Sequence, residues 1–168
     1  IMTYTLTGGC YCGDLRYETT GPPKAKAQCH CRECQYASGG GPNYFMVMPG
    51  DGFRYTQGSP ATFTRDDLDE PVTREFCVRC GTHILTRRLD MADVVLKIGT
   101  LDDPAGGYKA PLAAIFTVDL QPYHMIPAGL PQIEGLPQRR RGHQILSSRQ
   151  GAFAFSVGGF PALSDAEV

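Results

Sequence analysis

The seven cysteines of this 168-residue chain fall into three short groups. The groups are Cys10 and Cys12, then Cys29, Cys31 and Cys34, and finally Cys77 and Cys80. Thiols one or two residues apart can bind one metal ion from a single loop. Seven is an odd number, so a pure disulfide framework would leave one thiol over. Because buried free thiols need no such clustering, the pattern predicts metal sites, and thiolates favour zinc.

The number of thiols in each group predicts two sites of different kinds. The first and third groups together supply four thiolates, which complete a tetrahedral shell as in structural zinc sites; we call this the four-cysteine site. The middle group supplies three and leaves a fourth position for water or a substrate thiolate, as in catalytic zinc sites; we call this the three-cysteine site. We therefore predict two zinc ions per chain, one structural and one with an open coordination position.

Other interpretations of the three-cysteine site remain open at this stage. It could be a closed structural site, with His30 or a distant side chain as the fourth ligand. Cys31 and Cys34 also have the spacing of a thiol–disulfide exchange pair. His30, His83 and His124 are each compatible with a functional role or with an ordinary solvated position.

Frequent turn residues limit the secondary structure that this chain can form. Glycine occupies 20 positions and proline 13, which leaves little uninterrupted length for helices. Segments rich in β-branched and aromatic residues predict strands at 3–7, 15–19, 43–48, 53–56, 61–64, 73–76, 83–87, 94–98 and 113–118, the first two as a hairpin. One helical turn is predicted at 32–37. The predicted fold is therefore mainly β, a small zinc-binding fold of short antiparallel strands with little helix.

The C-terminal third differs in composition from the rest of the chain. From Leu120 onward a proline-rich path is predicted to lie extended over the sheet, and residues 1–138 are predicted to form one zinc-binding domain. Residues 139–168 open with three consecutive arginines and contain one strand-like piece at 152–157. We predict that they form a basic C-terminal extension of unknown role.

Charge and hydropathy narrow the classes of partner. Sixteen basic and seventeen acidic residues give a net charge of −1, which argues against nucleic-acid binding. No stretch approaches the roughly 18 consecutive apolar residues of a membrane span, and the N-terminus lacks a basic region followed by an apolar segment. We expect a soluble cytoplasmic protein without a membrane partner. Exposed strand edges could support a homodimer.

The order of the cysteine motifs resembles the glutathione-dependent formaldehyde-activating enzyme family, which includes the centromere protein V group. The stretches that carry the resemblance are GGCYCG at 8–13, CHCRECQYASG at 29–39 and FCVRCGT at 76–82. Downstream, IFT at 115–117 and the run from 121 to 137 are similar to the closing segment of the family. Tyr123 stands there where the family pattern has tryptophan. The resemblance extends over about residues 3–138.

This resemblance implies a tent-like β fold with a closed four-cysteine zinc site and an open three-cysteine zinc site. It implies a carbon–sulfur lyase type of activity, in which glutathione and formaldehyde give S-hydroxymethylglutathione in formaldehyde detoxification. The expected partners are therefore glutathione or another small thiol and an aldehyde, although a related adduct is an alternative substrate. On this hypothesis the open zinc position holds the glutathione sulfur, and His30 and Ser38 are the candidate catalytic residues that donate to the developing alkoxide.

Two functions without catalysis compete with this hypothesis. Because the adduct of glutathione and formaldehyde also forms spontaneously, the protein could be a carrier of glutathione or of the adduct. It could also be a zinc-stabilised interaction module whose basic tail contacts a partner or nucleic acid. The number of metal ions, and whether one has a free coordination position, separates these cases.

Overall fold

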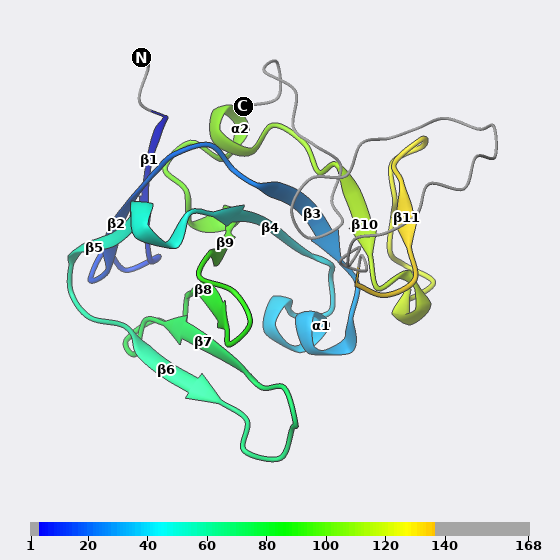
Figure 1. The fold of residues 1–168 in the computed structure, drawn as a ribbon, viewed down its shortest axis with the longest axis horizontal. Helices are drawn as coiled ribbons and strands as arrows, with labels where there is room; N and C mark the ends of the chain where they lie inside the picture. The colour runs from blue at the N-terminus through cyan, green and yellow to red at the C-terminus, as the bar shows by residue number, and fades with distance from the viewer. Residues whose placement is uncertain (1–3, 137–168) are drawn as a thin grey trace, which may run out of the picture.

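The computed structural model describes residues 4–136 (Figure 1). They form eleven strands, which are arranged in two sheets, and five short helices. The strands are β1 (Thr5–Gly9), β2 (Arg16–Thr20), β3 (Ala25–Cys29), β4 (Asn43–Met48), β5 (Phe53–Gln57), β6 (Ala61–Thr64), β7 (Val72–Phe76), β8 (His83–Arg88), β9 (Val94–Lys97), β10 (Ala113–Ile115) and β11 (Gln132–Ile133). The helices are α1 (Arg32–Ser38), α2 (Pro104–Tyr108) and the 3-10 helices η1 (Gly50–Gly52), η2 (Ile98–Thr100) and η3 (Thr117–Asp119). The predicted mainly β class is confirmed.

Three antiparallel strands make the smaller sheet, in the order β1-β2-β5. The predicted N-terminal hairpin is confirmed, because β1 pairs with β2 from Thr5 opposite Thr20 to Gly9 opposite Arg16. The turn of this hairpin carries the first cysteine pair. β4 and β5 follow each other along the chain but belong to different sheets, so the chain crosses between the sheets at η1.

The larger sheet has eight strands in the order β11-β10-β3-β4-β9-β8-β7-β6. The neighbouring strands in the part of this sheet ordered β3-β4-β9-β8-β7-β6 are antiparallel, as predicted. In contrast, β10 runs parallel to β3, and β11 runs parallel to β10. Figure 1 shows β10 and β11 on the opposite side of the molecule from β1, β2 and β5, with α1 close to the end of β3. The proline-rich path therefore adds a strand to the sheet edge at β11, in addition to its predicted extended course.

Neither β3 nor β11 was among the predicted strands, and α2 was also missed. The sequence of β3, AKAQC, has no β-branched or aromatic residue, yet all five positions are buried. Its position inside the sheet therefore decides its conformation. α2 is only five residues long and depends on Pro104 at its first turn and on Asp103, which accepts a hydrogen bond from the Gly106 N–H.

The alternation of side chains along β4 divides the core into two clusters. Met46 and Met48 point into one cluster, whereas Phe45 and Val47 point into the other. The first cluster also contains Cys10 and Cys77, and the second contains Cys29. Each predicted metal site therefore adjoins its own apolar cluster, so a bound metal ion would constrain the same loops as the packing.

Some sequence predictions lie outside the described residues. These are the domain boundary at 138, the extension 139–168 and its strand-like piece at 152–157. Among residues 4–136, no helix is long and apolar enough to cross a membrane.

Gly8 of β1 lies close against the backbone of η2. A Cβ atom at Gly8 would lie 2.2 Å from the Thr100 carbonyl oxygen and 2.3 Å from the Tyr17 hydroxyl. Because backbone cannot move away cheaply, Gly8→Ala is expected to lower the free energy of unfolding by roughly 1–3 kcal/mol in urea titrations. Gly99→Ala is the control, since a Cβ there meets nothing within 4 Å. Equal unfolding midpoints for the two variants would contradict this account of the packing.

Candidate metal centres

The four-cysteine site joins two turns that belong to different sheets. Cys10 and Cys12 lie in the β1–β2 turn, and Cys77 and Cys80 lie in the β7–β8 turn. Their sulfur atoms all lie within 4.8 Å of one another. The structure therefore brings together the residues that the sequence predicted for this site, across a separation of 65 residues between Cys12 and Cys77.

The distances between these sulfurs suit a tetrahedral zinc ion. The Sγ atoms of Cys10 and Cys12 are 3.5 Å apart, and those of Cys12 and Cys77 are 3.7 Å apart. Four sulfurs at about 2.3 Å from one zinc ion would be separated from each other by about 3.8 Å. Both distances therefore fit ligands of a single tetrahedral ion.

Hydrogen bonds from neighbouring groups hold the two turns in this arrangement. The Leu15 N–H donates to the Cys10 sulfur at 3.2 Å, and the Tyr11 N–H donates to the Thr82 hydroxyl of the opposite turn at 3.1 Å. Hydrogen bonding to Thr82 lowers the pKa of the Cys80 thiol to about 5. The two turns are thus connected by a hydrogen bond as well as by sulfur contacts. The Cys80 thiol favours the thiolate form, which binds metal.

The three-cysteine site forms where β3 ends and α1 begins. Cys29 is the last residue of β3, Cys31 is the N-cap of α1, and Cys34 lies in the first turn of the helix. The Cys34 N–H donates to the Cys31 sulfur at 3.3 Å, and the three sulfurs lie within 4.8 Å of one another. The short helix that the sequence predicted at 32–37 therefore sets the spacing of the trio.

Within residues 4–136, no fourth histidine, cysteine or acidic side chain joins the three sulfurs. Cys29 is buried, whereas Cys31 and Cys34 are partly exposed. All three are free thiols, so no disulfide joins Cys31 to Cys34. The site is thus enclosed on the side of the sheet and accessible from the side of Cys31 and Cys34, which suits three protein ligands and one exchangeable ligand.

A basic side chain and an amide on neighbouring strands face the trio. The Asn43 side-chain amide at the start of β4 donates to the Cys34 sulfur at 3.6 Å. Hydrogen bonds with Cys29 and Cys31 lower the pKa of Cys34 to about 3, and the charge of Lys97 acts in the same direction. Burial lowers the pKa of Lys97 itself to about 8, against the opposite effect of the three sulfurs. Lys97 therefore supplies positive charge to a site that three thiolates would make negative.

His30 is placed between two of the predicted ligands, but its ring points away from them. The side chain is completely buried, with Nδ1 2.9 Å from Nδ1 of His124 and Nε2 3.1 Å from the amide nitrogen of Gln28. Burial, and then the proximity of His124, lowers the pKa of His30. His30 is therefore neither near a position for a fourth ligand nor free to contact a molecule bound at the sulfurs in this conformation.

Ser38, the other candidate catalytic residue, lies at the exposed end of α1. Its hydroxyl donates to the Gly41 carbonyl oxygen in the loop that follows the helix. In this conformation the hydroxyl proton is already engaged. The catalytic roles of His30 and Ser38 stay predictions.

Sequence reasoning missed four residues that surround the trio, namely Gln28, Gln35, Asn43 and Lys97. It also missed the contact of His30 with His124. Gln35 is buried on α1 and donates to the His30 and Asp119 carbonyl oxygens at 2.6 and 3.0 Å. The only available signal was the position of Lys97 within a predicted strand, where alternation leaves each residue on one of two faces. Nothing in a single sequence indicates which distant residue shares that face.

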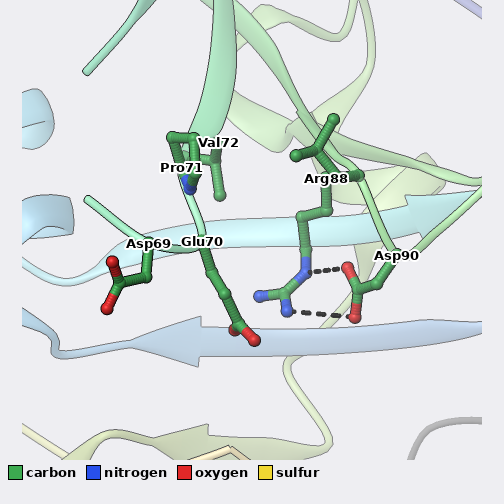
Figure 2. Close-up of a pocket in the computed structure, with 7 residues that line it drawn as sticks. Asp69, Glu70, Pro71, Val72, Arg88 and Asp90 are labelled. Carbon is green, nitrogen blue, oxygen red and sulfur yellow. Dashed lines mark hydrogen bonds and ion pairs between the residues drawn. The ribbon is translucent and has the colours of Figure 1, made fainter. Parts of the chain in front are cut away.

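A surface pocket of about 230 Å³ lies elsewhere, between the β6–β7 and β8–β9 connections (Figure 2). Figure 2 shows the Arg88 guanidinium turned toward Asp90, to which it donates two hydrogen bonds of 3.0 and 3.2 Å. Asp69 and Glu70, which also line the pocket, are exposed. None of the predicted site residues lines this pocket, so the chemistry discussed below belongs to the sulfur sites.

Comparison with known proteins identifies the chain at the level of a family. The model of the glutathione-dependent formaldehyde-activating enzyme family matches residues 5–119, a range that contains all seven cysteines. The match ends before the closing segment at 121–137. No curated protein matches the sequence significantly. A crystal structure of a Rhodobacter sphaeroides protein from structural genomics has a TM-score of 0.47 and 14% sequence identity, and the similarity covers 63% of this chain and 98% of that chain.

The two sites are expected to contribute differently to stability. Cys77→Ser should remove one zinc ion per chain and lower the free energy of unfolding by several kcal/mol, because the four sulfurs connect two sheets. Cys31→Ser should also remove one ion but cost less, because the trio lies within one strand–helix junction. Metal content by mass spectrometry and urea unfolding check both expectations. An equal loss of stability in the two variants would contradict the division into a structural site and an open one.

The partly buried His83 predicts a dependence of stability on pH. Burial, and then the charge of Lys97, lowers the pKa of His83 to about 3, so its neutral form favours the folded state. This stability is present above the unfolded pKa of about 6.5 and is lost as the pH falls from there toward 3. Between pH 7 and 5.5 the parent should lose about 1 kcal/mol more unfolding free energy than His83→Gln, which keeps a donor for the Leu85 carbonyl oxygen. Parallel pH profiles in urea titrations would contradict the assignment.

Proposed function

This chain belongs to the glutathione-dependent formaldehyde-activating enzyme family, and we propose that it joins glutathione to formaldehyde at the three-cysteine site to give S-hydroxymethylglutathione. The observation that carries the proposal is the arrangement of the three sulfurs, which lie within 4.8 Å of one another with no fourth ligand among residues 4–136. The reaction forms one carbon–sulfur bond, and the thiol proton ends on the former aldehyde oxygen. It involves no net oxidation or reduction, so no further co-reactant is needed. In reverse, it is a carbon–sulfur lyase reaction.

We propose that zinc is the cofactor of both sites. The sulfurs of Cys10, Cys12, Cys77 and Cys80 would hold one ion, and those of Cys29, Cys31 and Cys34 would hold the other. When bound by three protein thiolates, zinc supplies a fourth coordination position that stabilises a further thiolate and lowers its pKa. The donor sets support this proposal, because soft thiolate ligands at these separations suit zinc.

The charge of Lys97 is the contribution of this chain to binding an anionic sulfur. Three cysteine thiolates around a divalent ion leave an excess of negative charge, which a fourth thiolate increases. The charge of Lys97, a partly buried residue, offsets that excess, because partial burial weakens screening by solvent. Phe45 supports the same ammonium, whose nitrogen lies 6.0 Å from the ring centroid.

Positioning accounts for much of the expected rate enhancement. Two reactants held next to each other react as if one of them were at very high effective concentration. The rim formed by Cys31 and Cys34 is the accessible side of the site, so both reactants would approach from there. A developing alkoxide needs a donor, and Lys97 is the cationic donor that faces the sulfurs from β9. His30 and Ser38 would have to give up their present hydrogen bonds to take this role.

Exchange NMR of glutathione with formaldehyde tests the proposed reaction. The zinc-loaded protein should increase the rate of interconversion between free glutathione and S-hydroxymethylglutathione above the spontaneous rate, and Cys31→Ser should abolish the increase. Lys97→Met is expected to reduce the increase by roughly 10- to 100-fold, because it removes one stabilising charge.

Lys24→Met serves as the matched control for the lysine substitution. Lys24 pairs with Asp93 at the surface and lies outside the proposed site, so this variant should retain the parental rate. Equal exchange rates with and without the parent protein would reject the enzyme. If glutathione nevertheless bound saturably, the carrier function would replace it.

A further inference from the structure

A buried pair of histidines lies directly behind the three-cysteine site. His30, from the loop that carries the trio, and His124, from the segment after η3, are separated by 94 residues, yet their Nδ1 atoms are 2.9 Å apart. The surface of His30 is completely buried, and only 8% of the His124 surface is exposed. Two imidazole nitrogens at this distance share one proton, because one must donate and the other accept.

The neighbours of His124 determine which nitrogen carries the proton. The Gln121 backbone N–H, which can only donate, points at Nδ1 of His124 at 3.3 Å. The Gly40 carbonyl oxygen, which can only accept, lies 2.8 Å from Nε2 of His124. In this arrangement Nε2 of His124 is the donor and Nδ1 is the acceptor. Its Nδ1 accepts a hydrogen bond from the Nδ1–H of His30.

The other end of the chain of hydrogen bonds is fixed in the same direction. With its proton on Nδ1, His30 has an accepting Nε2, and the Gln28 amide donates to it at 3.1 Å. The second proton of that amide points to the Met125 carbonyl oxygen at 3.4 Å, which fixes the orientation of the amide. The side-chain carbonyl oxygen of Gln28 is left buried without a hydrogen-bond partner. We call this series the histidine relay, comprising Gln28, His30, His124 and Gly40.

The histidine relay connects the two parts of the chain that carry the sulfurs. Gln28 and His30 flank Cys29 on the strand side. Gly40 follows α1, the helix that carries Cys34. His124 bridges these parts from outside and is packed edge-to-face against Tyr123, with ring centroids 4.9 Å apart. The relay thus sets the position of the strand end relative to the helix.

We propose that His124 is a positioning residue that acts through His30 to hold Cys29 and Cys31 in register with Cys34, so that three sulfurs alone form a ready metal site. This inference rests on the proposed metal site but not on the proposed reaction. A site closed by four ligands can draw its loops together through the ion itself. A site that leaves one position free has one protein ligand fewer, and hydrogen bonds behind the sulfurs replace that constraint.

The cost of the histidine relay argues against a role in packing alone. Two buried imidazoles and an unpartnered amide oxygen are more expensive to bury than apolar side chains of the same volume. The opposite face of β3, which carries Ala27 and Cys29, is filled by an apolar cluster, so polar side chains are not required to pack this strand. In return, the fixed donor directions give one orientation of the loop, which apolar packing does not specify.

Long-range proton–nitrogen correlation NMR of the zinc-loaded full chain tests the proton positions without any substitution. His30 should show the pattern of a neutral ring protonated on Nδ1, and His124 that of a neutral ring protonated on Nε2. The opposite tautomers, or a charged ring at neutral pH, would overturn the proposed relay.

Two substitutions of His124 separate its two hydrogen bonds. His124→Asn places a carbonyl oxygen where Nδ1 was and keeps an acceptor for His30. His124→Gln keeps a donor for Gly40 but leaves the His30 proton without an acceptor. Zinc affinity of the three-cysteine site, measured by competition with a chromogenic chelator, should fall by roughly 10- to 100-fold in both variants, because each breaks one of the two bonds by which His124 joins the strand end to the helix. Cobalt(II)-loaded His124→Gln should also show a changed visible spectrum for this site.

Two controls make the outcome decisive. The four-cysteine site of the same molecule should keep its zinc affinity. The Cys31→Ser variant, which lacks the three-cysteine site, shows the signal of the four-cysteine site alone. Tyr108→Phe removes a buried hydrogen bond of 2.9 Å to the Ala27 carbonyl oxygen, also on β3, without touching the relay. Unchanged affinity in His124→Gln, or an equal loss in Tyr108→Phe, would overturn the inference. Neither readout needs turnover, so an inactive protein with an intact relay would refute the proposed reaction alone.

Discussion

Sulfur atoms from two turns far apart in the sequence lie close enough together to bind one metal ion. The rest of the structure depends on that contact. The strands of this chain are short, and three of them form a sheet that would be marginal by itself. The four-cysteine site connects the turn of this small sheet to a turn of the larger one, beside an apolar cluster that includes Cys10 and Cys77. A metal ion held by these four sulfurs would therefore stabilise the same junction as the apolar cluster.

The two sulfur sites differ in what surrounds them, and this difference separates structure from chemistry. Around the four-cysteine site, neighbouring N–H and hydroxyl groups satisfy the sulfurs locally. Around the three-cysteine site, a half-buried ammonium faces partly exposed sulfurs, and a buried network of side-chain hydrogen bonds lies behind them. Positive charge at an accessible site favours an anionic ligand, while the network behind it fixes the geometry that such a ligand meets.

Local chemistry explains why much of this could be predicted from sequence. Cysteine spacing and glycine-rich turns are local signals, so both cysteine clusters, the hairpin and the short helix at 32–37 could be derived from the residues. β3 could not, because AKAQC has no strand propensity and is held in place by its neighbours. The contact of His30 with His124 and the charge interaction of Lys97 with the sulfurs join segments distant in sequence. A single sequence carries no record of such pairs, so His30 was interpreted as a candidate catalytic residue, whereas the structure surrounds it with protein.

Cadmium-113 NMR of the doubly loaded protein tests most directly whether one site is closed and the other open. The account predicts two resonances, one in the range of four thiolate ligands and one in the range of three. Added glutathione should move only the second resonance, toward the four-thiolate range, and Cys31→Ser should remove it. Two resonances that both lie in the four-thiolate range before glutathione is added, or that both stay in place afterwards, would contradict the account.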